Sequence, residues 1–379
     1  FTDESGQNNP FVVGRYVGDE YFCDRAAETD FLIKQMENGR NVAIVSPRRM
    51  GKTGLIRHCF GQERMAGWNT FFIDIYATTS LDEFVYLLGK SIYEQLKSRG
   101  RALVERFFSI ISSLRMGFKF DASSGEPVLD IGLGDIHVPQ TTLDEIFRYL
   151  ETSEKPCVVA IDEFQQIGTY ADSNVEAMLR TMMQQCRRTV FVFAGSRRHV
   201  MNNMFNSPSK PFYQSAVTMG LEPIEAGVYS DFAVRMFAGR GRRLDSGVPG
   251  QVHAMFDGCT WFVQMVMNEL FAMTPEGGVC DVTMVDTALE NVVMSQESAY
   301  REILSHVTPK QKLVLAAIAR EGTARAVTSA KFVKKYGLAS ASAVQAAIKL
   351  LLKNDMVTQE NGGYRVYDYF FSRWLAAEY

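Results

Sequence analysis

The stretch Val42-Ala43-Ile44-Val45-Ser46-Pro47-Arg48-Arg49-Met50-Gly51-Lys52-Thr53 decides the fold of this chain. Its first four residues are apolar and mostly β-branched, which is typical of a strand buried on both faces. The next eight have the spacing of a phosphate-binding loop, except that Ser46 replaces the first glycine of that pattern. An apolar-periodic segment, residues 55–60, follows as a helix. The succession of strand, loop and helix predicts a P-loop nucleotide site.

The loop predicts specific contacts with the phosphates of a nucleotide. Backbone N–H groups of residues 50–54 are expected to surround the β-phosphate at a helix N-terminus, where the helix dipole favours an anion. We expect Lys52 to bridge the β- and γ-phosphates and the Thr53 hydroxyl to ligate Mg²⁺. ATP and Mg²⁺ are therefore the predicted cofactors. The predicted cofactor-binding residues of the loop are Pro47, Arg48, Arg49, Met50, Gly51, Lys52, Thr53 and Gly54.

A second motif, Val158-Val159-Ala160-Ile161-Asp162-Glu163, ends an apolar strand in two carboxylates. Such a strand delivers acids to the carboxyl edge of a parallel sheet, where ligands bind in open α/β folds. We expect Asp162 to hold Mg²⁺ through water and Glu163 to polarise the water that attacks the γ-phosphate. An Ile-Asp-Glu run by itself is more often an exposed strand end. Its position after the phosphate loop favours the catalytic interpretation.

A third apolar strand, residues 190–194, ends in Gly195-Ser196-Arg197-Arg198. At the tip of this strand, Ser196 is expected to contact the γ-phosphate or the attacking water. Arg197 is a candidate for neutralising transition-state charge, either within its own chain or on a neighbouring subunit of a homo-oligomer. The alternative is that the two arginines only occupy the start of a helix. With Lys52 and Glu163, Ser196 and Arg197 complete the predicted catalytic set.

Short apolar runs alternate with segments of helical period over the first half of the chain, which predicts an α/β fold with a parallel sheet. Residues 118–138 are predicted to form an irregular or hairpin insertion. The predicted domains are an ATPase core over residues 10–222, a helical lid over 223–306 and a winged helix-turn-helix over 307–379. The predicted strands of the core cover residues 42–45, 70–75, 158–161, 190–194 and 216–219.

The charge of the chain is divided unevenly. The whole sequence of 379 residues has 40 Lys and Arg against 43 Asp and Glu, which excludes a uniformly basic nucleic-acid binder. Residues 309–379, however, hold eleven Lys or Arg and five Asp or Glu, a formal charge of +6, so the remainder carries −9. This asymmetry is typical of a DNA-contacting module on an acidic protein. The segment 340–345 offers only Ser and Gln for base edges, so a protein partner stays open as the alternative.

The patterns of cysteine, histidine and apolar residues indicate the cellular compartment, the metal sites and the membrane spans to expect. The six cysteines are scattered without a CxxC pair, which predicts reduced thiols and a cytoplasmic location. The five histidines have no metal-ligand spacing, so no metal beyond the Mg²⁺ of the nucleotide is predicted. No apolar run reaches the 18 or more residues of a membrane-spanning helix, and no membrane span is predicted.

Five segments together resemble the archaeal-type ATPase family, part of the AAA+-related STAND class of P-loop ATPases. They are Phe11-Val12-Val13-Gly14-Arg15, Phe22-Cys23-Asp24-Arg25 with Glu28, the phosphate loop, Ile161-Asp162-Glu163-Phe164, and the closing Tyr367-Asp368-Tyr369-Phe370-Phe371-Ser372-Arg373-Trp374-Leu375. The resemblance implies a RecA/AAA+-like parallel sheet, a helical lid and a C-terminal winged helix. It also implies that Phe22 and Arg25 lie near the adenine. Thr260 stands where relatives often have proline in the lid.

Two functions fit this sequence. In the first, hydrolysis of Mg-ATP drives or gates a conformational change of the lid and the winged helix. In the second, the chain is a slow nucleotide-dependent switch, or a DNA- or protein-binding regulator, with little turnover. Both functions use the same ATP and ADP site, so the sequence leaves both open.

Overall fold

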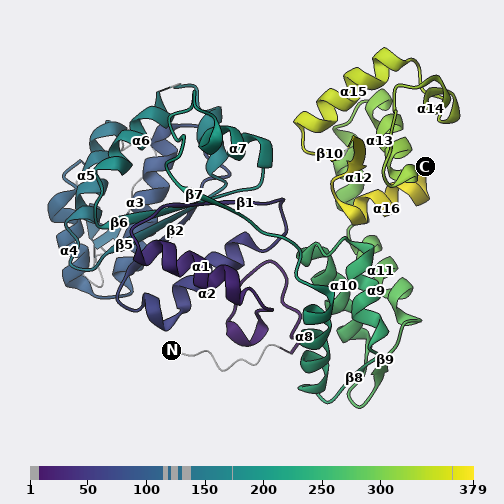
Figure 1. Ribbon diagram of the computed structural model, residues 1–379, viewed down its shortest axis with the longest axis horizontal. Helices are drawn as coiled ribbons and strands as arrows, with labels where there is room; N and C mark the ends of the chain where they lie inside the picture. The colour runs from purple at the N-terminus through teal and green to yellow at the C-terminus, as the bar shows by residue number, and fades with distance from the viewer. Residues whose placement is uncertain (1–7, 114–117, 121–126, 130–137, 173, 361) are drawn as a thin grey trace. The chain divides into compact units, whose positions relative to one another are not determined.

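The structure is a computed structural model that describes residues 8–113, 118–120, 127–129, 138–172, 174–360 and 362–379 (Figure 1). The chain forms two compact units, each described here by itself. One unit comprises residues 14–224, and the other joins the described residues before Gly14 to residues 225–379. No helix of the described residues is long and apolar enough to cross a membrane.

The first unit is built on a five-stranded parallel sheet with the order β2-β5-β6-β1-β7. All five strands were predicted, each within a few residues of its observed limits, and the α/β fold class is confirmed. The order places β6 between β1 and β5, which carry the two main motifs. The strands are β1 (Val42–Val45), β2 (Asn69–Asp74), β5 (Cys157–Asp162), β6 (Thr189–Gly195) and β7 (Val217–Gly220).

Alternate residues of the strands enter two hydrophobic cores, one on each face of the sheet. Val42 and Ile44 of β1 point into one core, whereas Ala43 and Val45 point into the other. Both faces are therefore buried, as the continuous apolar strands predict. The first core is closed by α1 (Ala26–Glu37) and α2 (Lys52–Gly61). The second is closed by α3 (Leu81–Lys97), α4 (Arg101–Ile110), α5 (Pro139–Glu151), α6 (Val175–Gln185) and α7 (Arg198–Asn206).

The predicted hairpin insertion is described in part. The strands β3 (Phe118–Phe120) and β4 (Pro127–Leu129) pair antiparallel. The other residues of the insertion lie outside the described residues, apart from Val138. Short 3-10 helices cover Asp19–Tyr21 (η1), Glu63–Met65 (η2) and Phe164–Thr169 (η5).

The second unit begins with helices, as predicted for residues 225–306. They are α8 (Ala226–Ala238), α9 (Gly247–Met255), α10 (Thr260–Met273), α11 (Met284–Ser295) and α12 (Glu297–Ser305). A small parallel pair, β8 (Arg243–Leu244) with β9 (Val279–Cys280), lies among them. The sequence showed only helical patterns here, because strands of two residues are too short to produce a period.

The segment that precedes Gly14 packs on these helices. Phe11 is fully buried, and its ring lies 5.5 Å from that of Phe237 and 6.1 Å from that of Phe271. The side chain of Asn268 donates a hydrogen bond to the carbonyl oxygen of Phe11 (2.7 Å). The chain therefore passes between the two units twice, at residues 13–14 and at residues 224–225.

The last part of the second unit has the predicted winged-helix pattern of three helices and a hairpin, and a fourth helix, α16, follows. A capping box of Thr308 with Gln311 begins the first helix, and Ser340 caps the third. The six free cysteines of the chain include none in this part. The elements are α13 (Pro309–Glu321), α14 (Ala330–Lys335), α15 (Ala341–Lys353), β10 (Val357–Glu360), β11 (Gly363–Val366) and α16 (Tyr369–Glu378).

Aromatic rings join the winged helix to the helices before it. The ring of Phe262 lies 4.9 Å from that of Tyr369 and 5.1 Å from that of Phe370. Asp257 accepts hydrogen bonds from Arg365 (2.7 Å) and from the Tyr369 hydroxyl (2.9 Å). Partial burial raises the pKa of Asp257, but these two hydrogen bonds outweigh it and leave the pKa below its ordinary value. Aromatic packing and the hydrogen bonds of Asp257 thus hold the winged helix on the helical part.

Candidate functional site

Three neighbouring strands deliver the predicted site residues to one edge of the sheet. The strand β1 leads into the phosphate loop, β5 ends at Asp162, and β6 ends at Gly195, just before Ser196. Because the strands are parallel, their carboxyl ends meet at this edge. The topology therefore assembles residues that are more than a hundred positions apart in the sequence.

The phosphate loop closes around the side chain of Lys52. The lysine is 6% exposed, and its ammonium donates to the carbonyl oxygens of Ser46 (3.1 Å) and Pro47 (2.9 Å). Arg49 (φ 68°) and Gly51 (φ 92°) have left-handed backbone conformations that turn the chain into α2. The first N–H groups of α2 have no carbonyl partner within the helix. These donors and the ammonium are suited to bind the oxygens of a phosphate chain.

The two main motifs touch through Thr53 and Asp162. The Thr53 hydroxyl donates a hydrogen bond of 2.5 Å to the Asp162 carboxylate, which is only 5% exposed. Burial raises the pKa of Asp162 above its ordinary value, and the Thr53 hydrogen bond and the Lys52 charge offset part of this rise. A hydroxyl and a buried carboxylate at this distance are oxygen ligands of the kind that Mg²⁺ prefers, so the donor set fits that ion.

Glu163 is held by polar side chains from the 3-10 helix η5 and from the residue that follows β6. Its backbone is left-handed (φ 55°), and its carboxylate accepts a hydrogen bond from the Ser196 hydroxyl (2.7 Å). Gln165 donates a second, short hydrogen bond to the same oxygen. The Arg48 guanidinium donates to the Ser196 hydroxyl (3.2 Å) and thereby connects the phosphate loop to this group. A carboxylate held in this way at the strand end is placed to orient a water molecule.

Sequence reasoning missed Gln165, although it is 5% exposed and lies between Glu163 and Ser196. The signal was a polar residue two positions after the acidic pair. Arg197 lies at the N-cap position of α7, directly after Ser196, and is partly buried. The structure thus brings Arg48, Lys52, Thr53, Asp162, Glu163 and Ser196 into connected contacts and places Arg197 beside them in the chain.

Phe22 lies against α2, just beyond the phosphate loop. Its ring stacks on the imidazole of His58 with a centroid distance of 4.3 Å and an angle of 20°. A Cβ atom at Gly54 would lie 3.5 Å from the Phe22 ring, so this glycine allows the close approach. Arg25 is 5% exposed and pairs with Glu28 (2.6 Å). Its buried Nη2 forms no hydrogen bond with the residues that the structure describes.

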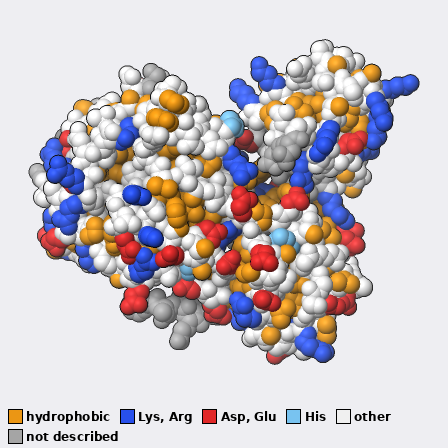
Figure 2. All heavy atoms as spheres, viewed as in Figure 1, with side chains coloured by type: hydrophobic (Ala, Val, Ile, Leu, Met, Phe, Trp, Pro, Cys, Tyr) orange, Lys and Arg blue, Asp and Glu red, His pale blue; other side chains and the backbone are white. Residues whose placement is uncertain are grey.

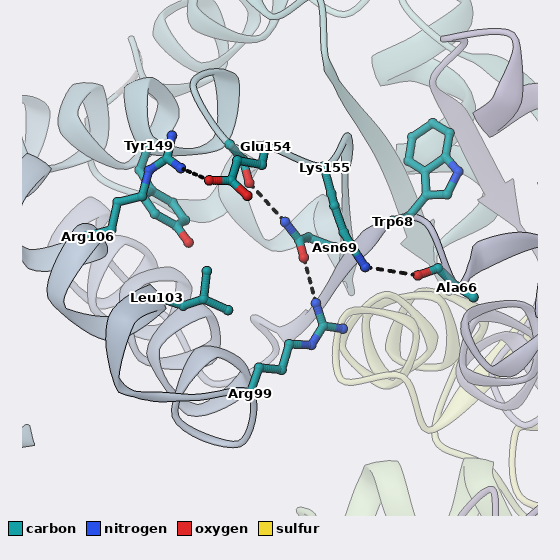
Figure 3. A pocket seen from close by; sticks show the side chains of 10 residues that line it. Ala66, Trp68, Asn69, Arg99, Leu103, Arg106, Tyr149, Glu154 and Lys155 are labelled. Carbon is teal, nitrogen blue, oxygen red and sulfur yellow. Dashed lines mark hydrogen bonds and ion pairs between the residues drawn. The ribbon is translucent and has the colours of Figure 1, made fainter.

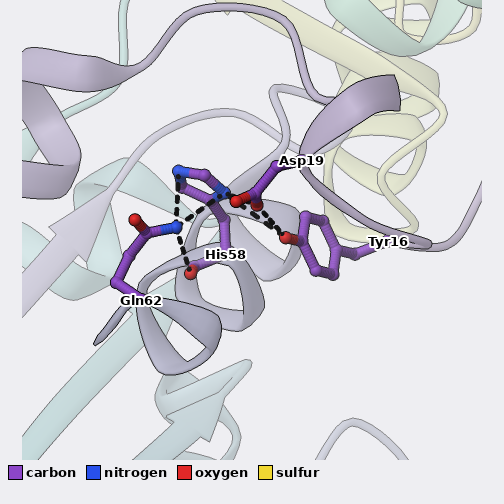
Figure 4. Close-up of polar contacts among 4 residues, drawn as sticks. All are labelled: Tyr16, Asp19, His58 and Gln62. Atoms are coloured by element: carbon purple, nitrogen blue, oxygen red, sulfur yellow. Dashed lines mark hydrogen bonds and ion pairs between the residues drawn. The ribbon is translucent and has the colours of Figure 1, made fainter. Parts of the chain in front are cut away.

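A polar cluster that the sequence did not reveal fixes the segment before Phe22 to the same helix (Figure 4). The Tyr16 hydroxyl donates to Asp19 (2.5 Å), and the same carboxylate oxygen lies 2.8 Å from Nδ1 of His58. The hydrogen bond from Tyr16 holds the pKa of Asp19 below its ordinary value. Asp19 and His58 thus hold this segment beside the first turns of α2.

This parallel sheet, with a phosphate loop and an acidic strand end at one edge, is the architecture of the P-loop ATPases. A family model described as a probable winged helix domain matches residues 298–377. No curated protein matches the sequence. The archaeal-type ATPase fold with a C-terminal winged helix, which the sequence resemblance implied, is confirmed by solved structures of archaeal proteins.

The structure is similar to the Walker-type ATPase PABY2304 of Pyrococcus abyssi, with 17% sequence identity, a TM-score of 0.66, and coverage of 97% of this chain and 99% of that one. It is also similar to the Aeropyrum pernix ORC2 protein in ADPNP-ADP complexes, with 12% identity, a TM-score of 0.57, and coverage of 97% and 95%. The Aeropyrum pernix ORC1 protein in complex with DNA has 13% identity, a TM-score of 0.50, and coverage of 95% and 94%. At these identities the likeness establishes the fold.

Proposed function

We propose that this chain binds ATP with Mg²⁺ at the carboxyl edge of the sheet and hydrolyses it to ADP and phosphate in the cytoplasm. The contact between Thr53 and Asp162 carries the proposal, because it joins the phosphate loop to the acidic strand end. A similar fold was solved in ADPNP-ADP complexes, which supports a nucleotide at this place. The six free cysteines fit a reducing compartment.

Each residue of the site has a distinct task in this proposal. Lys52 exchanges its carbonyl partners for the β- and γ-phosphates, and Thr53 with Asp162 holds Mg²⁺, directly and through water. The bound ion would neutralise charge on the phosphate oxygens. Glu163 accepts the proton of the attacking water, and Ser196 orients that carboxylate. Arg48 and Arg197 supply positive charge at the γ-phosphate side.

Phe22 and Arg25 complete the nucleotide site on the side of the base. Stacking on His58 keeps the Phe22 ring against α2, and the ion pair with Glu28 holds Arg25. The unpartnered Nη2 of Arg25 supports a role as a donor to the nucleotide. We propose that these two residues contact the adenine end of ATP.

The nucleotide gates the second unit through the two chain crossings. One crossing, at residues 13–14, leads within a few residues to the Tyr16 cluster and Phe22, and the other follows β7. Contacts such as Phe262 with Tyr369 tie the winged helix to the helical part, so both are expected to move together. A ligand changes such an equilibrium only by its differential affinity for the two arrangements.

One observation favours the slow switch as the second candidate. One oxygen of the Glu163 carboxylate already accepts hydrogen bonds from Ser196 and Gln165, so a water molecule has to compete with these donors for that oxygen. Single-turnover measurement with radiolabelled ATP separates the candidates. Cleavage within seconds to a minute would establish an ATPase, whereas retention of intact ATP for many minutes would establish the switch.

The winged helix is proposed to bind DNA through phosphate contacts. In the space-filling view, Lys and Arg side chains lie around this part of the second unit (Figure 2). The similar Aeropyrum pernix ORC1 fold was solved in complex with DNA. Contacts of lysine with phosphates make binding salt-dependent and only weakly selective for sequence. The exposed lysines of this part include Lys331, Lys334, Lys335, Lys349 and Lys353.

Fluorescence anisotropy with labelled duplex DNA tests this role. A Lys349→Gln/Lys353→Gln variant should bind more weakly and with a smaller salt slope than the parent. Lys90→Gln/Lys97→Gln, which removes the same charge from α3, is the matched control and should leave binding unchanged. Equal binding by both variants would favour a protein partner for the winged helix.

A further inference from the structure

A cavity of about 460 Å³ lies at the opposite edge of the sheet, where β2 and β5 begin (Figure 3). Three cations, Arg99, Arg106 and Lys155, line it, together with the aromatic rings of Trp68 and Tyr149. They come from three separate regions, namely the turn before β2, the turn between α3 and α4 with α4 itself, and α5 with its connection to β5. This size is typical of pockets for small molecules. The nucleotide site described above uses none of these residues.

The cations of this pocket are only partly neutralised by the protein. Arg106 pairs with Glu154 (3.1 Å) and donates to the Thr152 carbonyl oxygen (2.5 Å). Arg99 donates to the neutral Asn69 side chain (2.6 Å), and Lys155 lies 3.3 Å from the Ala66 carbonyl oxygen. Within the described part of the chain, neither Arg99 nor Lys155 forms an ion pair. Two positive charges therefore converge on the pocket without a carboxylate of their own.

The floor of the pocket is polar and fixed. Asn69 is 8% exposed and donates to the Ser153 hydroxyl (2.9 Å), so its carbonyl oxygen stays turned toward Arg99. The Tyr149 hydroxyl is protonated and able to donate at neutral pH, and burial raises its pKa further, to about 12. Leu103 and Trp68 add apolar surface beside these donors. The pocket thus combines cationic donors with flat apolar walls.

We propose that this pocket binds a small organic anion, a phosphate or carboxylate group attached to a flat apolar body. Guanidinium groups bind both kinds of anion through paired hydrogen bonds, and an aromatic wall favours a planar body. A nucleic-acid strand is a poorer match, because the three cations line one cavity of small-molecule size together with apolar side chains.

Phenyl phosphate and benzoate are the probes for this site, and isothermal titration calorimetry on the whole chain is the measurement. Inorganic phosphate carries only the anionic group of phenyl phosphate, and phenol carries only its aromatic ring. Each of these two compounds should bind more weakly than phenyl phosphate. Each titration is repeated with Lys52→Ala, so that binding at the phosphate loop is recognised. The proposal expects equal affinity in the parent and in this variant.

Three variants of the pocket sharpen the test. Arg99→Gln should weaken binding of phenyl phosphate about tenfold, because one charge-assisted contact is lost. Glu154→Gln should strengthen it, because the competing carboxylate is removed. Arg101→Gln, a charge-matched control at the start of α4, should leave the affinity for phenyl phosphate unchanged. Folding of each variant is checked by circular dichroism. If Arg99→Gln does not fold, Lys155→Gln is used in its place.

The contrary results are equally specific. Loss of binding in Lys52→Ala with no effect of Arg99→Gln would move the anion to the phosphate loop and overturn the proposal. Absence of heat with both probes, or tighter binding of a single-stranded oligonucleotide than of phenyl phosphate, would overturn it as well. Failure of ATP hydrolysis would bear only on the proposed function, since this site is measured without ATP.

Discussion

The carboxyl and amino edges of the five-stranded parallel sheet are built by different means. At the carboxyl edge, Arg49 and Glu163 have left-handed backbone conformations, and the buried Oε1 of Gln165 has no partner among the described residues. At the amino edge, Asn41 and Asn69 link strand starts to neighbouring loops through hydrogen bonds with normal lengths. Such groups also occur at the amino edge, where Gln214 before β7 is left-handed (φ 52°) and the buried Oγ1 of Thr189 has no partner among the described residues. The carboxyl edge differs in that the buried charged side chains of Lys52 and Asp162 meet there. This difference supports the carboxyl edge as the place of the proposed reaction, whereas Asn69 and Arg99 at the amino edge are held by hydrogen bonds.

The strongest test of this comparison is the removal of the proposed base. Glu163→Gln should slow ATP hydrolysis by about a hundredfold to a thousandfold while ATP stays bound, because the amide retains the shape and loses the proton acceptor. Turnover is measured by phosphate release and binding by calorimetry. Glu154→Gln makes the same change at the amino edge and should leave turnover unaltered. Unchanged turnover in Glu163→Gln would reassign the base and direct attention to Ser196 and Arg197.

Binding of ATP should depend on the carboxyl edge alone. Lys52→Ala is expected to weaken ATP binding about a hundredfold, since a charge-assisted contact with the phosphates is lost from a loop that closes around this ammonium. Lys155→Ala removes a lysine from the amino edge and should bind ATP as the parent does. Calorimetry with a non-hydrolysable ATP analogue gives both affinities. Equal affinity of Lys52→Ala and the parent would refute the phosphate-loop assignment.

A glycine at the end of β6 tests how tightly the carboxyl edge is packed. A Cβ atom at Gly195 would collide with the side chains of Met201 and Gln165, which are both buried. Gly195→Ala should therefore lower the free energy of unfolding by about 1–3 kcal/mol and also slow hydrolysis, because Gln165 is displaced from Glu163. Gly220→Ala, at the end of β7, is the control, since its Cβ would meet no atom closer than 3.8 Å. Denaturant unfolding compares them, and equal losses would contradict the packing argument.

The parts of this molecule that the sequence predicted have strong local signals. Strands such as 42–45 are continuous apolar runs, and the phosphate loop has a fixed spacing, so the sequence predicts both. The sequence also predicts Asp162 and Glu163, because they directly follow another apolar run. Ser196 was predicted because a polar residue at the tip of a neighbouring strand must lie near that edge. The fold class follows from the alternation of these runs with helical segments.

The missed features depend on contacts between distant segments. Gln165, Tyr16 and His58 acquire their roles only when loops from different elements meet, and no local period marks such a meeting. Phe11 lies beside residues of the helical unit, although more than two hundred positions separate it from Phe237. The pair β8–β9 is too short for a pattern. A sequence pattern predicts the helix or strand to which a residue belongs, but it does not predict which residues from distant segments will lie next to it.

The smallest expected effect is a gain in the free energy of unfolding, whereas Gly195→Ala is expected to cause a loss. It tests whether the buried carboxylate at the carboxyl edge destabilises the folded protein. Burial raises the pKa of Asp162, so its charged form is disfavoured in the folded, nucleotide-free protein at neutral pH. In Asp162→Asn the amide oxygen can accept from the backbone N–H of Glu163, as the carboxylate does (3.0 Å), while the amide nitrogen donates to the Thr53 hydroxyl. We expect stabilisation of about 1 kcal/mol, seen as a melting temperature higher by about 2–4 °C.

The pH dependence gives this last prediction its sign. A carboxyl with a raised pKa in the folded state costs stability as the pH rises above its ordinary value near 4, and the cost disappears below that value. The stability advantage of Asp162→Asn over the parent should therefore shrink as the pH falls toward 4.

Mg²⁺ with ATP should reverse the order of the two melting temperatures at neutral pH, because the parent gains more stability from binding than a variant that lacks the carboxylate. Glu154→Gln, an exposed acid at the amino edge, should shift the melting temperature little at any pH. A nucleotide-free Asp162→Asn variant that melts below the parent at neutral pH would show that this carboxylate stabilises the fold, and it would contradict the contrast drawn between the two edges.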